Sequence, residues 1–132
     1  MLLTVTALVE AGTGVALLVA PSVVVKLLLG SPLDSAPAVM LGRVAGAALF
    51  ALGMTCWLAR TDIQSRVARG LVAAMLFYNL AAVVLFIFAG LSLGLHGIAL
   101  WPAVILHSAM MLWCLRCLWY LWQKQSDESV KT

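Results

Sequence analysis

The chain has 132 residues, of which 64% are hydrophobic and only 10% are charged. Its mean hydropathy of +1.10 lies far above that of water-soluble domains, so the composition excludes a soluble globule. The net charge is +3, but the basic residues stand at the ends of apolar segments rather than along one surface. This distribution argues against a nucleic-acid partner and makes the lipid bilayer the expected partner.

Four apolar segments are long enough to cross a hydrocarbon core of ~30 Å at about 1.5 Å per residue. We predict crossings at about residues 2–20, 38–59, 70–92 and 98–122, followed by a cytoplasmic tail at 123–132. The segment 22–30 is apolar but too short to span, and it carries Lys26, so we expect it to lie at the membrane interface. The predicted fold is therefore all-α, a single integral membrane domain built as a four-transmembrane-helix bundle over residues 1–132.

Basic residues are distributed unequally between the two sides of the predicted bundle. One side carries Arg60, Arg66, Arg69, Arg116, Lys124 and Lys131, and the other carries Lys26 and Arg43. Since cytoplasmic loops of membrane proteins carry an excess of lysine and arginine, we expect both termini to face the cytoplasm.

Three charged residues fall inside the predicted crossings: Arg116 lies near the cytoplasmic end of the fourth, and Glu10 and Arg43 lie deeper in the first and second. A charge near the bilayer centre costs about 3 kcal/mol even on insertion scales, so each of the two deeper residues needs a partner. Glu10 lies near the middle of the first crossing and Arg43 about two turns from the outer end of the second. We expect them to pair across the two helices.

Three further polar residues fall at a similar depth, namely Tyr78 and Asn79 of the third crossing and His107 of the fourth. With Glu10 and Arg43 they predict an interior site that binds a proton or a small polar ligand, because glutamate and histidine can change charge. In a second interpretation the same residues form a structural ion pair and interhelical hydrogen bonds. A small proton-coupled transporter is a further alternative.

Small residues mark one face of the second crossing. Gly42 and Gly46 are four residues apart, and Gly53 follows seven residues later, a spacing that lets another helix approach closely. We expect helix packing within the chain. The alternatives are a homodimer or an accessory subunit that uses this face as a scaffold contact in a larger membrane complex.

The cysteine, methionine and histidine residues do not indicate a particular chemical reaction. Cys114 and Cys117 form a CxxC, but it lies late in a membrane helix rather than at a helix start after a strand, so redox chemistry is disfavoured. Met110 and Met111 near His107 suit copper in principle, yet methionine in an apolar helix is more often packing material. We expect no cofactor, no metal site and no catalytic residue, and therefore not an enzyme.

Two parts of the sequence resemble known protein families. The stretch VEAGTGVALL around Glu10 resembles the first helix of small multidrug resistance transporters, which implies a membrane-embedded glutamate that binds cationic drugs and protons in an antiparallel dimer. The layout EAGTGVALLVAPSVVVKLLLG, LGRVAGAALFALG, a YN pair and WPAVILH is similar to small bacterial four-helix membrane proteins grouped as DoxX-like. This second resemblance implies a multi-pass protein of the bacterial inner (plasma) membrane and supplies no reaction.

Overall fold

The computed structural model describes residues 1–61 and 65–130, and the side chains of residues 1–61 and 65–123. All regular structure in this part of the chain is helical, which confirms the predicted all-α fold. The helices are α1 (Leu2–Val19), α2 (Pro21–Leu29), α3 (Ala36–Ala59), α4 (Arg66–Leu91) and α5 (Leu100–Val130). Four of them, α1, α3, α4 and α5, are long and apolar enough to cross a membrane.

Local sequence signals account for where these helices begin and end. Pro21 cannot continue the hydrogen-bonded ladder of α1, and Ala20 before it leaves the helical region with φ −137° and ψ 61°. Gly30 ends α2 in the left-handed conformation with φ 83°. Two serines then cap the next helices through their side chains: Ser35 accepts from the Ala38 amide at 3.3 Å and Ser65 from the Ala68 amide at 3.1 Å.

The helix ends lie within two residues of the predicted crossings except at two places. α4 begins at Arg66, four residues before the predicted crossing, and α5 continues to Val130, eight residues past residue 122. Hydropathy predicts which residues lie in the hydrocarbon core, whereas the helix itself ends where its backbone hydrogen bonds and capping residues end it. The apolar part of α5 that is able to span a membrane ends at Gln123.

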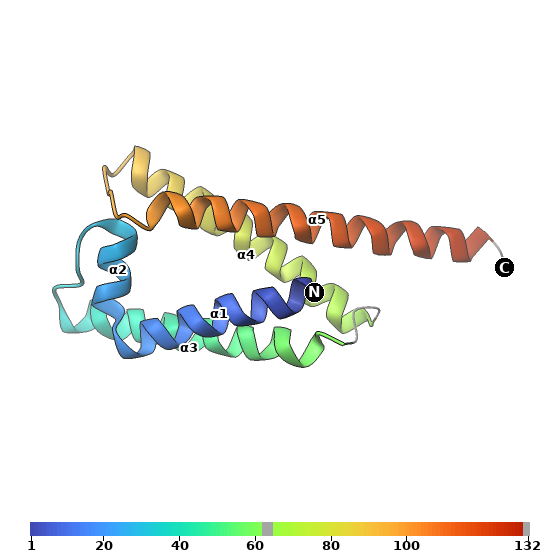
Figure 1. Ribbon diagram of the computed structural model, residues 1–132, viewed down its shortest axis with the longest axis horizontal. Helices are drawn as coiled ribbons and strands as arrows, with labels where there is room; N and C mark the ends of the chain where they lie inside the picture. The colour runs from blue at the N-terminus through green and yellow to red at the C-terminus, as the bar shows by residue number, and fades with distance from the viewer. Residues whose placement is uncertain (62–64, 131–132) are drawn as a thin grey trace.

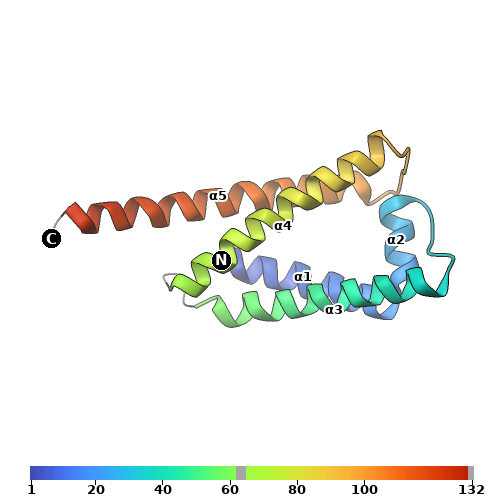
Figure 2. The same cartoon turned by 180° about the vertical axis from the view of Figure 1, so that it is seen from behind.

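The long helices form two pairs, which Figure 1 and the reverse view in Figure 2 show side by side. α1 packs along α3, and α4 packs along α5. The beginning of α1 reaches toward α4 and α5, and here all four helices share a buried core. That core consists of Leu2, Leu3, Ala7, Cys56, Val72, Met75, Met110 and Cys114.

Glycines set the close approach of α1 to α3. A Cβ atom built on Gly46 of α3 would lie 2.8 Å from the carbonyl oxygen of Gly14, and one built on Gly14 would lie 2.5 Å from the Phe50 amide nitrogen. A Cβ built on Gly53 would lie 2.6 Å from the Ala11 amide nitrogen, and one on Gly42 would meet the side chain of Pro21 at 2.9 Å. All three glycines of the predicted small-residue face are therefore packed within the chain, and this face is not available to a second copy.

The short helix α2 lies across one end of the two pairs (Figure 1). Its Leu27 carbonyl accepts a hydrogen bond of 2.9 Å from the Ala99 amide, just before α5. A Cβ on Gly30 would lie 2.9 Å from the His96 carbonyl oxygen, so the α2 end also packs against the turn between α4 and α5. α2 thus joins the α1–α3 pair to the α4–α5 pair through backbone contacts.

Candidate functional site: a buried polar cluster

The centre of the candidate site is Glu10 on α1. Its side chain is only 3% exposed, and it lies on the buried stripe of α1 that also includes Thr6 one turn earlier and Gly14 one turn later. The spacing of four residues places these side chains on one face. Because this face meets the other helices, the carboxyl group is enclosed by protein rather than by lipid.

The Tyr78 hydroxyl of α4 is close enough to the Glu10 carboxyl group to interact with it. The Cys56 thiol of α3 also lies within electrostatic range of this carboxyl. A phenol and a thiol are neutral groups, so Glu10 has polar neighbours but no neighbouring charge among them. This contact links α1 with α4, the two helices that face each other across the two pairs.

Asn79, the residue after Tyr78, is 1% exposed and fully bonded within the α4–α5 pair. Its Nδ2 atom donates to the Met75 carbonyl oxygen at 2.7 Å, and its Oδ1 atom lies 2.8 Å from Nδ1 of His107. The bond to Met75 fixes the orientation of the amide, so Oδ1 is the acceptor and His107 donates from Nδ1. A neutral His107 then presents Nε2 as an acceptor.

The aromatic rings join these contacts into one group. The His107 ring stands edge-on to Tyr78, with centroids 5.7 Å apart and an interplanar angle of 77°. On its other side Phe86 lies at 5.7 Å with the rings tilted by 49°. We call Thr6, Glu10, Tyr78, Asn79 and His107 the polar cluster. It draws on α1, α4 and α5, and four of its members were predicted as site residues.

Arg43 is the exception among the predicted site residues. Its side chain is exposed on α3, and no ion pair or hydrogen bond joins it to Glu10, although the structure describes both side chains. The predicted pairing of these two residues is therefore wrong. The physical reason is the register of the two antiparallel helices. Gly53 packs against Ala11, next to Glu10, whereas Gly42 packs against Pro21 just beyond the far end of α1. Arg43 therefore lies about ten residues, or ~15 Å, along the helix from the level of Glu10. Arg43 also lies beside the face of α3 that packs on α1, not within it.

Thr6 and Cys56 belong to the surroundings of Glu10 but were not among the predicted site residues. The Oγ1 atom of Thr6 is buried and has no hydrogen-bonding partner, although the residue is only 1% exposed. Threonine in a helix often bonds to a carbonyl one turn earlier, so the unpaired Oγ1 of Thr6 leaves a buried hydrogen-bonding group unsatisfied next to Glu10 on the same face of α1. The spacing of Thr6 and Glu10 on one face of α1 was the available sequence signal.

The cysteines form no bond with one another. Cys56 and Cys114 are buried and Cys117 is half-buried, and all three are free thiols. Among the described residues, no three histidine, cysteine or acidic side chains are grouped closely enough to hold a metal ion. The arrangement around Glu10 can take up and release a proton or hold a small polar group, and it offers no nucleophile paired with a base.

Comparison of the chain with protein-family models, with curated proteins and with solved structures finds no match. The two resemblances noted in the sequence therefore remain expectations. The geometry of the polar cluster is the basis on which a function can be assigned.

Proposed function

We propose that this chain is a small multi-pass membrane protein whose polar cluster binds a proton or a small polar ligand at Glu10, without catalysing a reaction. The observation that carries this proposal is a carboxyl group 3% exposed in the middle of a candidate membrane-spanning helix. Among the side chains that the structure describes, no cation forms an ion pair with it.

The energetics define the kind of ligand. An ionised carboxylate in such surroundings costs several kcal/mol unless it is paired. Tyr78 supplies a polar contact but no positive charge, so Glu10 requires either a proton or a bound cation to be stable. Since Arg43 is directed outward, the cluster has no fixed counter-charge for an anion. A proton or a small cationic ligand is therefore favoured over a small anion.

The polar cluster also suits proton binding because Glu10 does not stand alone. The side chains that face it from the neighbouring helices are Tyr78 of α4 and Cys56 of α3, and His107 of α5 contacts Tyr78. Each of these groups can donate or accept a hydrogen bond without carrying a charge. The hydroxyl hydrogen of Tyr78 and the thiol hydrogen of Cys56 can rotate, so these side chains can adjust to a neutral or an ionised Glu10.

The test is a pH titration of purified protein followed by infrared difference spectroscopy of the protonated-carboxyl band. We expect a band that shifts on deuteration and disappears in Glu10→Gln. The matched control is Asp34→Asn, which removes an exposed carboxylate from the loop between α2 and α3 and should leave the band unchanged. Identical spectra for wild type and Glu10→Gln, with Glu10→Gln folded, would show that Glu10 is not the binding group.

We further propose that the protein lies in a bacterial inner membrane with both termini on the cytoplasmic side. In support, both chain ends lie toward the same end of the structure (Figure 1), where α3 ends at Ala59 and α4 begins at Arg66. The basic residues Arg60, Arg66 and Arg69 are therefore grouped at that end, as cytoplasmic arginines usually are. A C-terminal fluorescent-protein fusion should be fluorescent and an alkaline phosphatase fusion inactive; the reverse pattern would contradict this orientation.

A scaffold role receives less support than the binding role. The small-residue face that would have contacted a larger complex is occupied by α1 and Pro21. An accessory subunit would need another contact surface.

A further inference from the structure

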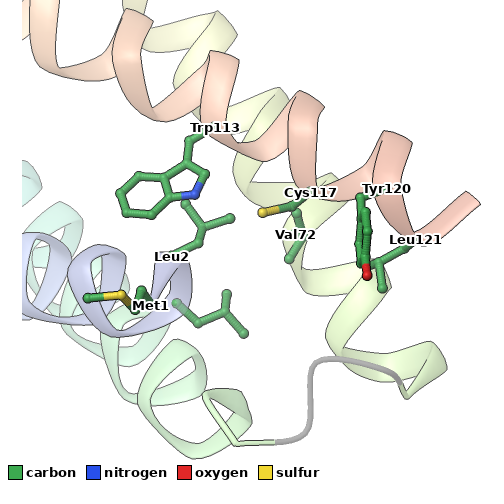
Figure 3. Close-up of a pocket in the computed structure, with 8 residues that line it drawn as sticks. Met1, Leu2, Val72, Trp113, Cys117, Tyr120 and Leu121 are labelled. Atoms are coloured by element: carbon green, nitrogen blue, oxygen red, sulfur yellow. The ribbon is translucent and has the colours of Figure 1, made fainter.

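An apolar pocket lies apart from the polar cluster, between the first turn of α1 and the second half of α5 (Figure 3). Met1 and Leu2 of α1 stand opposite Trp113, Cys117 and Tyr120 of α5, and Val72 of α4 lies between them. The volume of the pocket is about 160 Å³, similar to a cavity of about 150 Å³ that holds a benzene-sized apolar group. The walls are mostly apolar, so the pocket suits a hydrocarbon chain rather than a polar ligand.

The pocket continues along α5 into a second, more open depression. The two share Trp113, Cys117 and Tyr120, and the second one adds Arg116. A guanidinium group therefore lies beside the opening of an apolar slot. This combination matches a molecule with one anionic group and one hydrocarbon chain.

Arg116 has no carboxylate partner among the side chains that the structure describes. Glu10 is buried on α1, and Asp34 lies in the loop that follows α2 at the opposite end of the molecule. Arginine forms paired hydrogen bonds with phosphate oxygens, so an exposed and unpaired Arg116 favours a phosphate group as its partner.

The depth of Arg116 in the membrane indicates that the phosphate belongs to a lipid headgroup. Arg116 lies seven residues before Gln123, the end of the candidate span, or about 10 Å along the helix. From this depth an arginine side chain extends toward the headgroup layer. Tyr120 and the nearby Trp119 and Trp122 are exposed, and such rings prefer the same layer. The apolar pocket and Arg116 thus both lie at a depth where a lipid of the surrounding leaflet can contact them.

We propose that this pocket binds an anionic phospholipid, with a segment of one acyl chain between α1 and α5 and the headgroup phosphate on Arg116. The site is independent of Glu10. It differs from general contact with the bilayer because it requires both the slot and the guanidinium. Both phosphatidylglycerol and phosphatidylcholine carry a phosphate, but the choline ammonium cancels its charge in the second lipid. Phosphatidylglycerol should therefore bind more tightly than phosphatidylcholine with the same acyl chains.

The experiment is native mass spectrometry of detergent-purified protein titrated with each lipid in turn. One favourable contact between an arginine and an anionic headgroup contributes about 1 kcal/mol, or about a fivefold difference in affinity. We expect wild type to retain phosphatidylglycerol in preference to phosphatidylcholine, and Arg116→Gln to lose about fivefold in affinity for phosphatidylglycerol alone. The matched control is Arg43→Gln, which removes another exposed arginine within a candidate span and should leave the preference unchanged.

Two further arms test the apolar half of the site. Cys117→Phe fills the slot and should weaken both lipids equally while circular dichroism shows an unchanged helix content. Glycerol phosphate, which has the anionic group but no acyl chain, should not bind or compete. The proposal is overturned if wild type shows no preference, if Arg116→Gln retains it, if Arg43→Gln loses it equally, or if glycerol phosphate competes. Because Arg116 is exposed, its variant tests the proposal even if Cys117→Phe does not fold.

Discussion

The two helix pairs of this protein are held together by different means. α1 and α3 meet backbone to backbone through glycines, with no space for one additional carbon at Gly14, Gly46 or Gly53. α4 and α5 meet through side chains, including the hydrogen bond between Asn79 and His107. Close packing of backbones stabilises the α1–α3 pair without polar groups, whereas the contact between α4 and α5 uses buried polar side chains. One additional carbon should therefore disturb the α1–α3 pair more than the loss of one hydrogen bond disturbs the α4–α5 pair.

The largest effect should come from adding one carbon to the first pair. Gly14→Ala places a Cβ 2.5 Å from the Phe50 amide nitrogen, so α1 and α3 must separate, and we expect a loss of about 1–3 kcal/mol of unfolding free energy. The control is Gly12→Ala on the same helix, where a Cβ meets nothing within 4 Å. Unfolding in mixed detergent micelles, followed by circular dichroism, measures both. Equal stabilities would show that the close approach is not needed.

Substitutions in the α4–α5 pair should lower the unfolding free energy less, and the effects of two of them should be coupled. Asn79→Ala and His107→Ala each remove one partner of the 2.8 Å contact, and interhelical hydrogen bonds in membrane proteins contribute about 0.6 kcal/mol on average. We expect each single change to cost about 1 kcal/mol and a double-mutant cycle to give a coupling of about 0.6 kcal/mol. Additive effects would mean that the two side chains do not act as a pair.

We expect a smaller change in unfolding free energy at Thr6, where α1 faces the α4–α5 pair. Whether the change is a gain or a loss is informative. Thr6→Val replaces the unpaired hydroxyl with a methyl group of similar shape. If Oγ1 stays unpaired, this change should stabilise the fold by up to about 1 kcal/mol, because an unsatisfied buried group is removed. A loss of stability, or weaker proton binding at Glu10 in the infrared titration, would instead show that a polar group pairs with Thr6.

The smallest effect is expected outside both pairs. Arg43 is exposed and has no partner among the described side chains, so Arg43→Gln should change the unfolding free energy by no more than about 0.5 kcal/mol. The same micelle titration measures it. A loss comparable to that of Gly14→Ala would restore a structural role for this residue.

Hydropathy was sufficient to predict the fold because each crossing must supply about 20 apolar residues whatever its neighbours are. Depth was also predictable from the rise per residue, and it placed Glu10, Tyr78, Asn79 and His107 at one level. The register of two neighbouring helices and the rotation of each about its axis depend on their packing. The prediction for Arg43 failed in both respects, because Gly42 packs against Pro21 while Gly53 packs beside Glu10, against Ala11. The spacing of Gly42 and Gly46 already indicated which face of α3 is packed, and Arg43 stands about 100° from Gly42. The contact of Glu10 with Tyr78 could not be predicted, since it depends on how the two pairs meet.

The position of α2 determines how the two pairs can move relative to each other. Near the turn between α4 and α5, the hydrogen bond from Ala99 to Leu27 and the close contact of Gly30 with His96 tie the pairs backbone to backbone. At the other end, the described contacts between α1 and the α4–α5 pair are made by side chains such as Leu2, Val72 and Cys114. The two pairs are therefore held at both ends, by backbone contacts through α2 and by a buried apolar core where α1 begins, so a motion that exposes Glu10 to water has to break one of these two contacts.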